Sequence, residues 1–192
     1  LIREASLQIA DPQVRYLGTI GGNVANGDPA NDMPGLMQTL DATYHLTGPE
    51  GSRTIKARDF YEAAYFTARE DEEILTAISF AKPSGGFAYE KQKRKIGDYA
   101  TAAAGVLITI DGGTCTAASV ALTNLSDTPV YCAGAVDALV GSSLDDVAIK
   151  AAVKAAVDAS DPVADTRGPI DFKKYVAGVI VKKAITSAVA RA

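Results

Sequence analysis

A turn with the sequence Asp111-Gly112-Gly113 separates two apolar segments, Gly105–Ile110 and Cys115–Leu122. An Asp-Gly pair favours the left-handed dihedrals that a tight hairpin turn requires. We therefore predict two antiparallel strands joined by a hairpin. An alternating segment before them, Phe87–Lys93, predicts a third strand of the same sheet.

Behind the hairpin the apolar pattern changes to a helical period. A first helix is expected over Tyr131–Val140, with Gly141 as its C-terminal cap. Ser143, three residues before Asp146, resembles a capping signal for an Ala-rich helix that extends to Ala159.

The last helix is expected over Asp171–Ala190. Its apolar stripe is predicted to comprise Tyr175, Val176, Val179 and Ile180. Four lysines are expected to be solvated, namely Lys173, Lys174, Lys182 and Lys183.

The first part of the chain also mixes helices and strands. Short helices are expected over Arg3–Ala10 and Asp32–Leu40, on either side of a glycine-rich stretch from residue 18 to residue 27. Ala42–Thr47 predicts a strand, and the turn that follows it leads into a hairpin partner over Ser52–Lys56. The residues expected on one apolar face are Tyr44 and Leu46 in this strand, and Ile74, Ile78 and Phe80 in a later strand over Glu73–Phe80.

The Pro83-Ser84-Gly85-Gly86 sequence is typical of a boundary or a sharp turn. It divides the chain into residues 1–83 and residues 84–192. Each region combines strands with helices, which predicts an α+β fold for both.

Composition limits the classes of function. The chain has 192 residues, 47% of them hydrophobic and 22% charged, which is typical of a globular protein. Its net charge of −4 argues against nucleic-acid binding, which a basic surface favours, even though residues 91–95 form a short basic run. No apolar run approaches the roughly 18 residues of a membrane helix. The two cysteines form no CxxC pattern, which fits a reducing, cytoplasmic setting.

The segment with the clearest chemistry begins at Thr19-Ile20-Gly21-Gly22-Asn23 and ends at Asp32. Adjacent glycines let the backbone approach a ligand and present successive N–H groups to an anion. Such a loop suits a pyrophosphate, and Asp32 can accept a hydrogen bond from a sugar or ribityl hydroxyl. The alternative is a tight turn at the glycines, with Asp32 only capping the next helix. The spacing is not the G-x-G-x-x-G fingerprint, so a Rossmann fold is not expected.

Other candidate residues favour structural roles. His45, the only histidine, lies in the middle of a predicted strand, where a structural role is more common than catalysis. Cys115 and Cys132 are expected to be small core residues. Asp28 and Asp32 without further ligands are poor evidence for a metal site, so no metal is predicted in this chain.

Two longer runs carry a family resemblance. Asp11–Asn23, continuing through Asn26-Gly27-Asp28-Pro29, strongly resembles the flavoprotein subunits of the molybdenum hydroxylases, the xanthine dehydrogenase family. Phe87–Ala102 is similar to the medium subunits of the aerobic carbon monoxide dehydrogenases within that family. The resemblance extends over nearly the whole chain, and two long runs in the right order are more specific than either alone.

The resemblance implies a fold and a cofactor, FAD. Residues 1–83 would be the second subdomain of a vanillyl-alcohol-oxidase-type FAD-binding domain. Residues 84–192 would be a C-terminal domain with a three-stranded antiparallel sheet and a helical bundle. The residues implied at the FAD diphosphate are Thr19, Ile20, Gly21, Gly22 and Asn23. Further cofactor contacts are implied for Asp32, for the apolar Leu75, for Lys91 beside the isoalloxazine edge and for Tyr99 stacked on the ring. Without the resemblance, Lys91 would belong to a solvated basic face and Tyr99 to the core.

The resemblance also implies partners. A large subunit with a molybdenum–copper cofactor would oxidise carbon monoxide, and a small iron–sulfur subunit with two [2Fe–2S] clusters would pass electrons to FAD in this chain and on to a quinone. A dimer of heterotrimers in the cytoplasm is expected, with at most peripheral contact at the inner face of the membrane. An alternative within the family is an enzyme for an aromatic heterocycle or an aldehyde.

The chain opens at Leu1, without a methionine or a signal-like segment. Family members carry an upstream subdomain whose Ala-Gly-Gly-type loop holds the other side of the FAD diphosphate. We therefore expect an upstream part to be missing. The second hypothesis follows from it: a flavin-free module that serves only as a docking surface between the other subunits.

Overall fold

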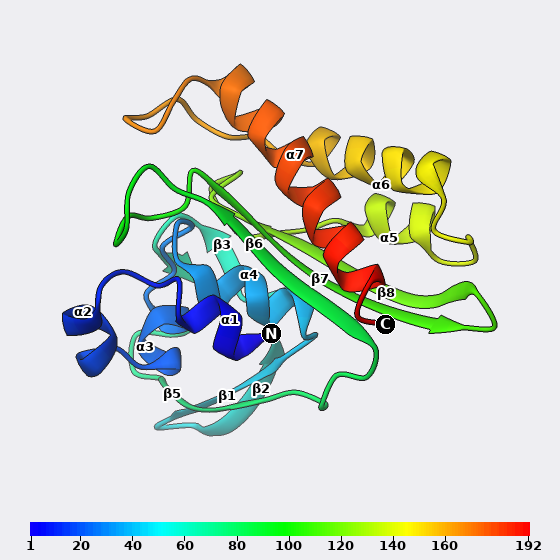
Figure 1. Ribbon diagram of the computed structural model, residues 1–192. Helices are drawn as coiled ribbons and strands as arrows, with labels where there is room; N and C mark the ends of the chain where they lie inside the picture. Colours follow the sequence, from blue (N-terminus) through cyan, green and yellow to red (C-terminus); the bar gives the residue numbers. More distant parts are fainter.

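The computed structural model describes residues 1–192 and shows four stacked layers of secondary structure (Figure 1). The first layer contains α5 (Ala133–Leu139), α6 (Asp146–Asp158) and α7 (Ile170–Val189). The second is an antiparallel sheet of β6 (Gly86–Gln92), β7 (Ala102–Asp111), β8 (Thr114–Thr123) and β9 (Val130–Tyr131), in that order. The third contains α1 (Ile2–Ser6) and α4 (Asp32–Thr39). The fourth is a sheet in the order β2 (Gly51–Lys56), β1 (Thr43–Gly48) and β5 (Ile74–Ser79).

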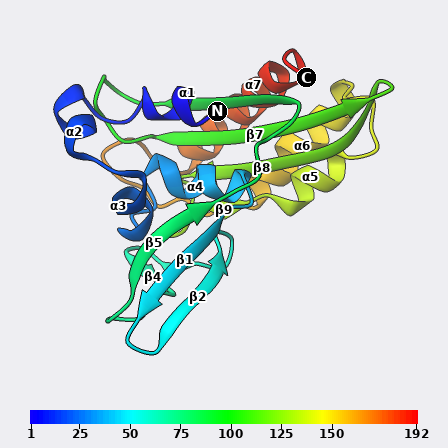
Figure 2. The ribbon, with the colours of Figure 1, turned by 90° about the horizontal axis from the view of Figure 1, so that it is seen from below.

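Four small elements lie outside these layers. Helices α2 (Pro12–Leu17) and α3 (Ile20–Ala25) lie at one end of the molecule, and β3 (Tyr61–Ala63) pairs with β4 (Phe66–Thr67) in a separate hairpin. Figure 2 shows the β1, β2 and β5 sheet extending away from the long strands β7 and β8. The predicted α+β fold is confirmed.

The central hairpin is as the sequence predicted. Strands β7 and β8 pair antiparallel, and Asp111 lies opposite Thr114. Gly112 and Gly113 have φ of 55° and 80°, the left-handed region that favours glycine. The sheet has one strand more than predicted, because Val130–Tyr131 pair with β8 as β9 and are not the start of a helix. The guanidinium of Arg58, 3.6 Å from the ring centroid of Tyr131, covers this short strand.

Helix α4 lies between the two sheets, and all eight of its residues are buried. Glycines allow this close packing. A Cβ at Gly35 would lie 2.3 Å from Oγ1 of Thr123 on β8, and a Cβ at Gly105 on β7 would lie 2.6 Å from Oγ1 of Thr39. Because neither position has room for a side chain, the part of α4 from Gly35 to Thr39 is fixed close to the C-terminal sheet.

Helix α7 differs from the prediction in the face that it buries. Val176 and Ile180 are buried as predicted, but Tyr175 and Val179 are exposed. Lys173 is buried, with 1% of its side chain exposed, because its Nζ lies 3.0 Å from Asp165 and donates to the carbonyl of Val163 at 2.8 Å. The prediction was wrong here since the helix packs on the sheet through a stripe of small residues, Ala177, Ala184 and Ala188.

The predicted cap of α6 is also wrong. Asp145 and not Ser143 is the N-cap, and its carboxylate accepts from the N–H groups of Val147 and Ala148 at 3.0 and 2.9 Å. Ser143 donates to Asp145 instead. Backbone donors hold the pKa of Asp145 below its usual value, although its slight desolvation acts against them. Helix α5 ends at Leu139, close to the predicted stop, but Val140 and not Gly141 is its C-cap, and the N–H of Gly141 donates to the carbonyl of Cys115 at 2.8 Å.

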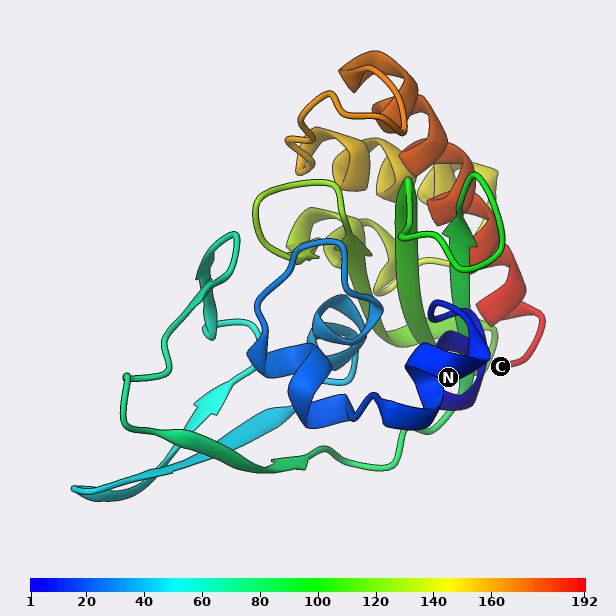
Figure 3. The same cartoon turned by 90° about the vertical axis from the view of Figure 1, so that its left-hand side faces the viewer.

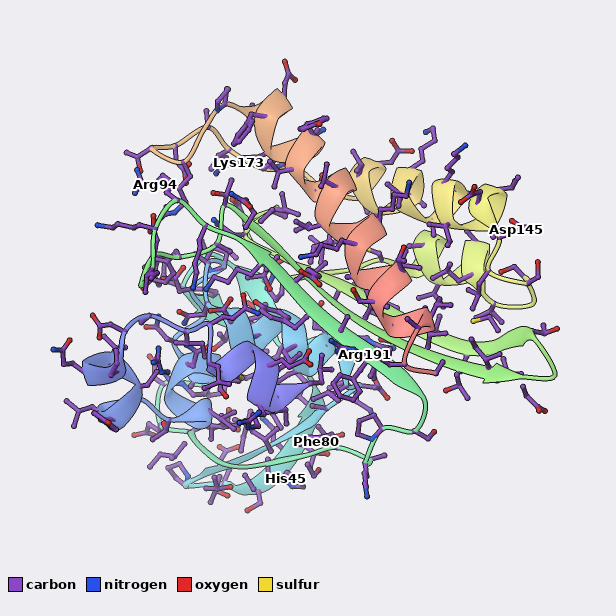
Figure 4. The ribbon with its side chains drawn as sticks, in the orientation of Figure 1. His45, Phe80, Arg94, Asp145, Lys173 and Arg191 are labelled. Atoms are coloured by element: carbon purple, nitrogen blue, oxygen red, sulfur yellow. The ribbon has the colours of Figure 1, made fainter.

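Strand β5 corrects the predicted apolar face. Leu46 and Tyr44 of β1 are buried as predicted, and they pair with Leu75 and Ile78. A bulge shifts the register there, so Leu75 and Ile78 both pack against the core, whereas Ile74 is exposed. Phe80 lies beyond the end of the strand (Figure 4).

The N-terminal helices are shorter and more numerous than predicted. The first helix ends at Ser6, and Ala10 has φ of 41°, which no helix continues through. The glycine-rich stretch, predicted as a loop, contains the helix α3.

Two apolar clusters form the core. One joins the β6–β9 sheet to α5, α6 and α7, and the other joins α1, α3 and α4 to the β1, β2 and β5 sheet. Tyr89 of β6 belongs to the second cluster, so the two regions of the chain share a packed boundary. None of the helices is both long and apolar enough to cross a membrane.

Candidate functional site

One side of the molecule gathers segments from both regions of the chain. Figure 3 shows this side, with α1, α2 and α3 (blue) below and the loop that follows β6 (green) above. The loop at residues 161–169 (orange) and the β3–β4 hairpin (teal) reach the same side. The predicted site residues of the glycine-rich turn and Tyr99 lie in these segments, whereas Asp32, Leu75 and Lys91 lie in α4, β5 and β6.

The first turn of α3 has free backbone donors. Thr19 is its N-cap, and the hydroxyl of Thr19 accepts from the N–H of Gly22 at 2.9 Å. The first N–H groups of a helix, here those of Ile20 and Gly21, have no acceptor within the helix. A Cβ built on Gly21 would lie 3.9 Å from Cδ2 of Leu75. Leu75, the residue predicted to make an apolar contact with the cofactor, therefore lies beside this turn.

Asn23 connects α3 to α4. Its side-chain Oδ1 accepts from the N–H of Met33 at 3.1 Å, and its carbonyl accepts from Nδ2 of Asn31 at 2.9 Å. Its side-chain oxygen and its main-chain carbonyl are thus both used within the protein. Asn23 therefore fixes the position of the glycine-rich turn relative to Asp32, the first residue of α4.

Asp32 and Lys91 form a buried ion pair between the two regions. Their charged atoms, Oδ2 and Nζ, are 2.7 Å apart, and only 5% and 1% of the side chains are exposed. The hydroxyl of Tyr89 donates to the other oxygen of Asp32. Burial, followed by the negative charge of Asp32, raises the pKa of Tyr89 well above its usual value, so this phenol stays a donor.

This geometry excludes two alternatives that the sequence left open. Lys91 does not belong to a solvated basic face. Asp32 does not serve as a cap, because Asn31 is the N-cap of α4 and the carboxylate of Asp32 accepts from β6 instead.

Tyr99 presents its ring to solvent on the same side. It is 46% exposed and thus not a core residue, and the guanidinium of Arg167 lies 5.5 Å from its ring centroid. Partial burial, then the charge of Asp28 and a hydrogen bond to it, raise the pKa of Tyr99. Asp32 makes the smallest contribution to the same shift.

Two cavities differ in their fitness for an anionic cofactor. A cavity of about 360 Å³ adjoins the glycine-rich turn and is lined by residues of α1, α2, α3 and α4, among them Arg15, Thr19, Gly22 and Asn23. A cavity of about 900 Å³ lies between the β1–β2 turn and residues 70–73. Its lining includes five acidic side chains, Glu50, Glu70, Asp71, Glu72 and Glu73, which repel a diphosphate.

The remaining candidates have structural surroundings. His45 is half-buried in β1, and its Nε2 hydrogen-bonds to Oγ of Ser79 at 2.8 Å. Cys115 and Cys132 are both buried, as expected of core residues, and burial raises the pKa of the Cys132 thiol to about 12. No group of three or more His, Cys, Asp or Glu side chains is arranged to hold a metal ion.

The sequence analysis missed Tyr89 and Gln8. The carbonyl of Gln8 accepts from Nζ of Lys91 at 3.3 Å and from Nζ of Lys93 at 3.2 Å. A signal for Tyr89 was present, since residues two apart on a strand share a face and Tyr89 precedes Lys91 by two. No local signal points to Gln8, because its contact is made by a main-chain carbonyl.

The chemistry of this donor set fits FAD. A diphosphate needs donors, which the first turn of α3 leaves free. An isoalloxazine ring needs a flat apolar partner and a cation near its oxygen edge, and Tyr99 and Lys91 are of these types. Only Cδ2 of Leu75 lies within 4 Å of a Cβ built on Gly21, so few protein atoms cover the backbone at this glycine.

Two protein-family models match the chain. The FAD binding domain in molybdopterin dehydrogenase matches residues 1–83, and the CO dehydrogenase flavoprotein C-terminal domain matches residues 87–188.

Individual proteins are similar over the whole chain. A carbon monoxide dehydrogenase medium chain from Afipia carboxidovorans is 56% identical over 100% of this chain and 67% of that protein. A glyceraldehyde dehydrogenase medium chain from Sulfolobus acidocaldarius is 32% identical over 96% of this chain and 66% of that protein. The solved structure of reconstituted CO dehydrogenase from Oligotropha carboxidovorans gives a TM-score of 0.98 at 56% identity, over 100% of this chain and 68% of that chain. The present chain thus spans about two thirds of the length of these relatives.

Proposed function

This chain belongs to the carbon monoxide dehydrogenase medium-chain family of FAD-binding oxidoreductase subunits, and we propose that it carries electrons from iron–sulfur clusters through FAD to a quinone. The observation that supports this best is the convergence on one side of the free first turn of α3, the buried Asp32–Lys91 pair and the exposed ring of Tyr99. FAD, when bound, accepts and releases electrons.

The glycine-rich turn would hold the diphosphate. We assign this role to Thr19, Ile20, Gly21, Gly22 and Asn23, in a family-type FAD-binding domain whose second subdomain is residues 1–83. The N–H groups of the first turn donate to phosphate oxygens, and the partial positive charge of the helix end favours an anion. Since Thr19 and Asn23 are hydrogen-bonded within the protein, their role is to fix the turn.

Lys91 and Asp32 would adjust the electrostatics at the flavin edge. Lys91 presents a positive charge that stabilises negative charge on the reduced ring. Asp32 holds that ammonium in place and offsets part of the cost of burying it. Tyr99 would stack on one face of the ring, and Leu75 would make an apolar contact beside the glycine-rich turn.

The proposal includes partners. A large subunit would hold the molybdenum–copper cofactor and oxidise carbon monoxide, and a small subunit would hold the [2Fe–2S] clusters, in a dimer of heterotrimers. The assembly would lie in the cytoplasm and reach a quinone at the inner face of the membrane. Carbon monoxide is favoured over an aldehyde because the chain is far more similar to the carbon monoxide dehydrogenase relative than to the glyceraldehyde dehydrogenase one.

The test is the stoichiometry of FAD in the assembly purified from its native host with the full-length form of this chain. We expect FAD equimolar with the chain. An assembly in which this chain is present without flavin would contradict the proposal and favour the docking module.

A matched pair of variants tests the glycine-rich turn. In Gly21→Ala the new Cβ meets only Leu75, at an ordinary 3.9 Å, so folding should be unchanged while the methyl group obstructs the ligand. The control is Gly178→Ala in α7, away from the site, where the new Cβ meets Val157 and Val153 at an ordinary 3.6 and 3.7 Å. We expect at least a tenfold weaker retention of FAD in Gly21→Ala alone, roughly the 1.4 kcal/mol of one lost hydrogen bond to a charged group. Equal retention in both variants would contradict the assignment of the turn.

A further inference from the structure

A network of charged side chains links the loop that carries Tyr99 to the segment before α7. We define the Tyr99 loop as residues 93–101 and the α7 approach as residues 161–169. The guanidinium of Arg167 donates to Asp98 of the Tyr99 loop at 3.1 Å and to Asp165 of its own segment at 3.2 Å. Arg94 reaches across in the other direction, because it bonds Asp98 at 2.9 Å and donates to the carbonyl of Thr166 at 3.0 Å.

The buried end of α7 anchors this network. Nζ of Lys173 lies 3.0 Å from Asp165 and donates to the carbonyl of Val163 at 2.8 Å. The backbone N–H of Arg167 also donates to Asp165, at 2.8 Å. In Figure 4, Lys173 and Arg94 lie at the same corner of the molecule, on α7 and on the green loop. The chain of contacts therefore runs from a buried lysine of the helix layer to the residue before Tyr99.

The Tyr99 loop has few other means of keeping one conformation. It contains Gly97 with φ of 84°, and Ile96 is almost fully exposed. Its second half is held by Asn124, whose Nδ2 donates to the carbonyl of Ala100 at 2.5 Å. Asp98 is 8% exposed, and its carboxylate is bonded by two arginines, Arg94 and Arg167.

We propose that Arg167 is a positioning residue that sets the orientation of the Tyr99 ring, by fixing Asp98 beside it and by placing a guanidinium 5.5 Å from the ring centroid. The inference rests on the proposed function, since it gives the ring an orientation that matters at a flavin.

The shape of arginine explains why this residue suits the position. A guanidinium is a planar fork that donates to two carboxylates at once and still presents a face to an aromatic ring. A lysine in the same place supplies the charge from a single point. Arg167 uses one terminal nitrogen for Asp98 and the other for Asp165, so both carboxylates depend on the fork.

The test uses the full-length chain in its FAD-loaded assembly, with the variants Arg167→Gln and Arg167→Lys. The matched control is Arg94→Gln, which removes the more exposed partner of Asp98 and leaves Arg167 against the ring. Two readouts are taken: amide hydrogen exchange at Asp98 and Thr101, whose N–H groups donate to the carbonyls of Lys95 and Gln92, and the visible circular dichroism of the bound flavin.

In both Arg167 variants we expect amide exchange about tenfold faster, which corresponds to the loss of roughly one hydrogen bond to a charged group. We also expect an altered circular dichroism signal of the flavin. In Arg94→Gln we expect a wild-type flavin signal. Wild-type exchange and flavin signal in FAD-loaded Arg167→Gln would overturn the inference, and so would faster exchange without a change at the flavin. If Arg167→Gln fails to assemble, Arg167→Lys, which keeps the charge, decides by the same two readouts. A wild-type assembly without FAD would instead overturn the proposed function.

Discussion

Two lysines are buried, Lys91 at the boundary between the two regions of the chain and Lys173 in the first turn of α7, which we call the α7 corner. The two differ in their partners. Lys91 and Lys173 both expose 1% of their side chains. The partner of Lys91 is Asp32, 5% exposed, whereas the partner of Lys173 is Asp165, 29% exposed. One pair is therefore enclosed, and the other joins a buried ammonium to a carboxylate that keeps contact with water.

The difference shows what each pair is suited to. An enclosed ion pair contributes little net stability, because desolvation of both charges offsets their attraction. The proposed function would give this pair a role, since a bound flavin would need a cation there. The pair at the α7 corner loses less solvation at its carboxylate, and its neighbours Arg167 and Arg94 extend it to the Tyr99 loop. We interpret the boundary pair as part of the site and the corner pair as its support.

The largest effect is expected from Lys91→Met. The substitution leaves the carboxylate of Asp32 buried with only the hydroxyl of Tyr89 as a side-chain partner. We expect a loss of about 3–5 kcal/mol in the free energy of unfolding, together with loss of FAD, measured by urea denaturation and by flavin content. The double variant Lys91→Met/Asp32→Asn removes both charges and should recover much of the stability without the flavin. A single variant as stable as the wild type would remove the distinction between the two pairs.

A smaller effect is expected from Lys173→Met. Asp165 remains partly hydrated and keeps its bonds from Arg167, so we expect a loss of about 1–3 kcal/mol in the same denaturation measurement. FAD content should stay at the wild-type level. If this variant lost FAD as completely as Lys91→Met, the corner pair would belong to the site itself.

The stability of the protein should also depend on pH, through the charged network at the Tyr99 loop. Burial raises the pKa of Asp98, but hydrogen bonds from Arg94 and Arg167 and their charges outweigh it, so the net pKa is lowered. A lowered pKa means that the contribution of Asp98 to stability is complete above the unfolded pKa, about 4, and is lost as the pH falls through the folded value.

We therefore expect the wild type to melt above Asp98→Asn at pH 6, with the difference shrinking as the pH falls below about 4. Thermal melts of both proteins over this range are the measurement. A difference that stays constant with pH would mean that the charge of Asp98 does not stabilise the loop.

The smallest effect concerns the cap of α6, a part of the C-terminal region remote from both lysine pairs. Asp145→Ala removes the acceptor of two backbone N–H groups and should lower the melting temperature by about 2 °C. Ser143→Ala should leave it unchanged, because the hydroxyl of Ser143 accepts from no helix N–H. A lower melting temperature for Ser143→Ala than for Asp145→Ala would instead support Ser143 as the cap, as the sequence suggested. Neither variant should alter FAD content.

The fold was predictable where the cause is local. The Asp-Gly-Gly turn predicted the β7–β8 hairpin, and alternation placed Tyr44 and Leu46 in the core. Predictions failed where the cause lies elsewhere in the chain. Val130–Tyr131 became a strand because β8 offers it a partner, and Ile74 became exposed because a bulge shifts β5 against β1.

The candidate site shows the same division. A family resemblance pointed to Asp32, Lys91 and Tyr99, but no pattern along the chain indicated that Asp32 and Lys91 form a buried pair. The alternation of faces along a strand could have indicated Tyr89, two residues before Lys91. No such pattern indicates Gln8 or Arg167, because their contacts join segments distant in sequence.

The sequence by itself determined the α+β class, the turns and the kinds of group available for a flavin, because backbone dihedral preference and side-chain chemistry are properties of single residues and their neighbours. Only the tertiary structure decided which charges are buried and which rings are exposed. Lys173 is a charged residue that the helical pattern placed among the solvated lysines. It is nevertheless enclosed, because α7 packs its first turn against the segment that contains Asp165. Burial is a property of the packed chain, and the electrostatics of the site follow from burial.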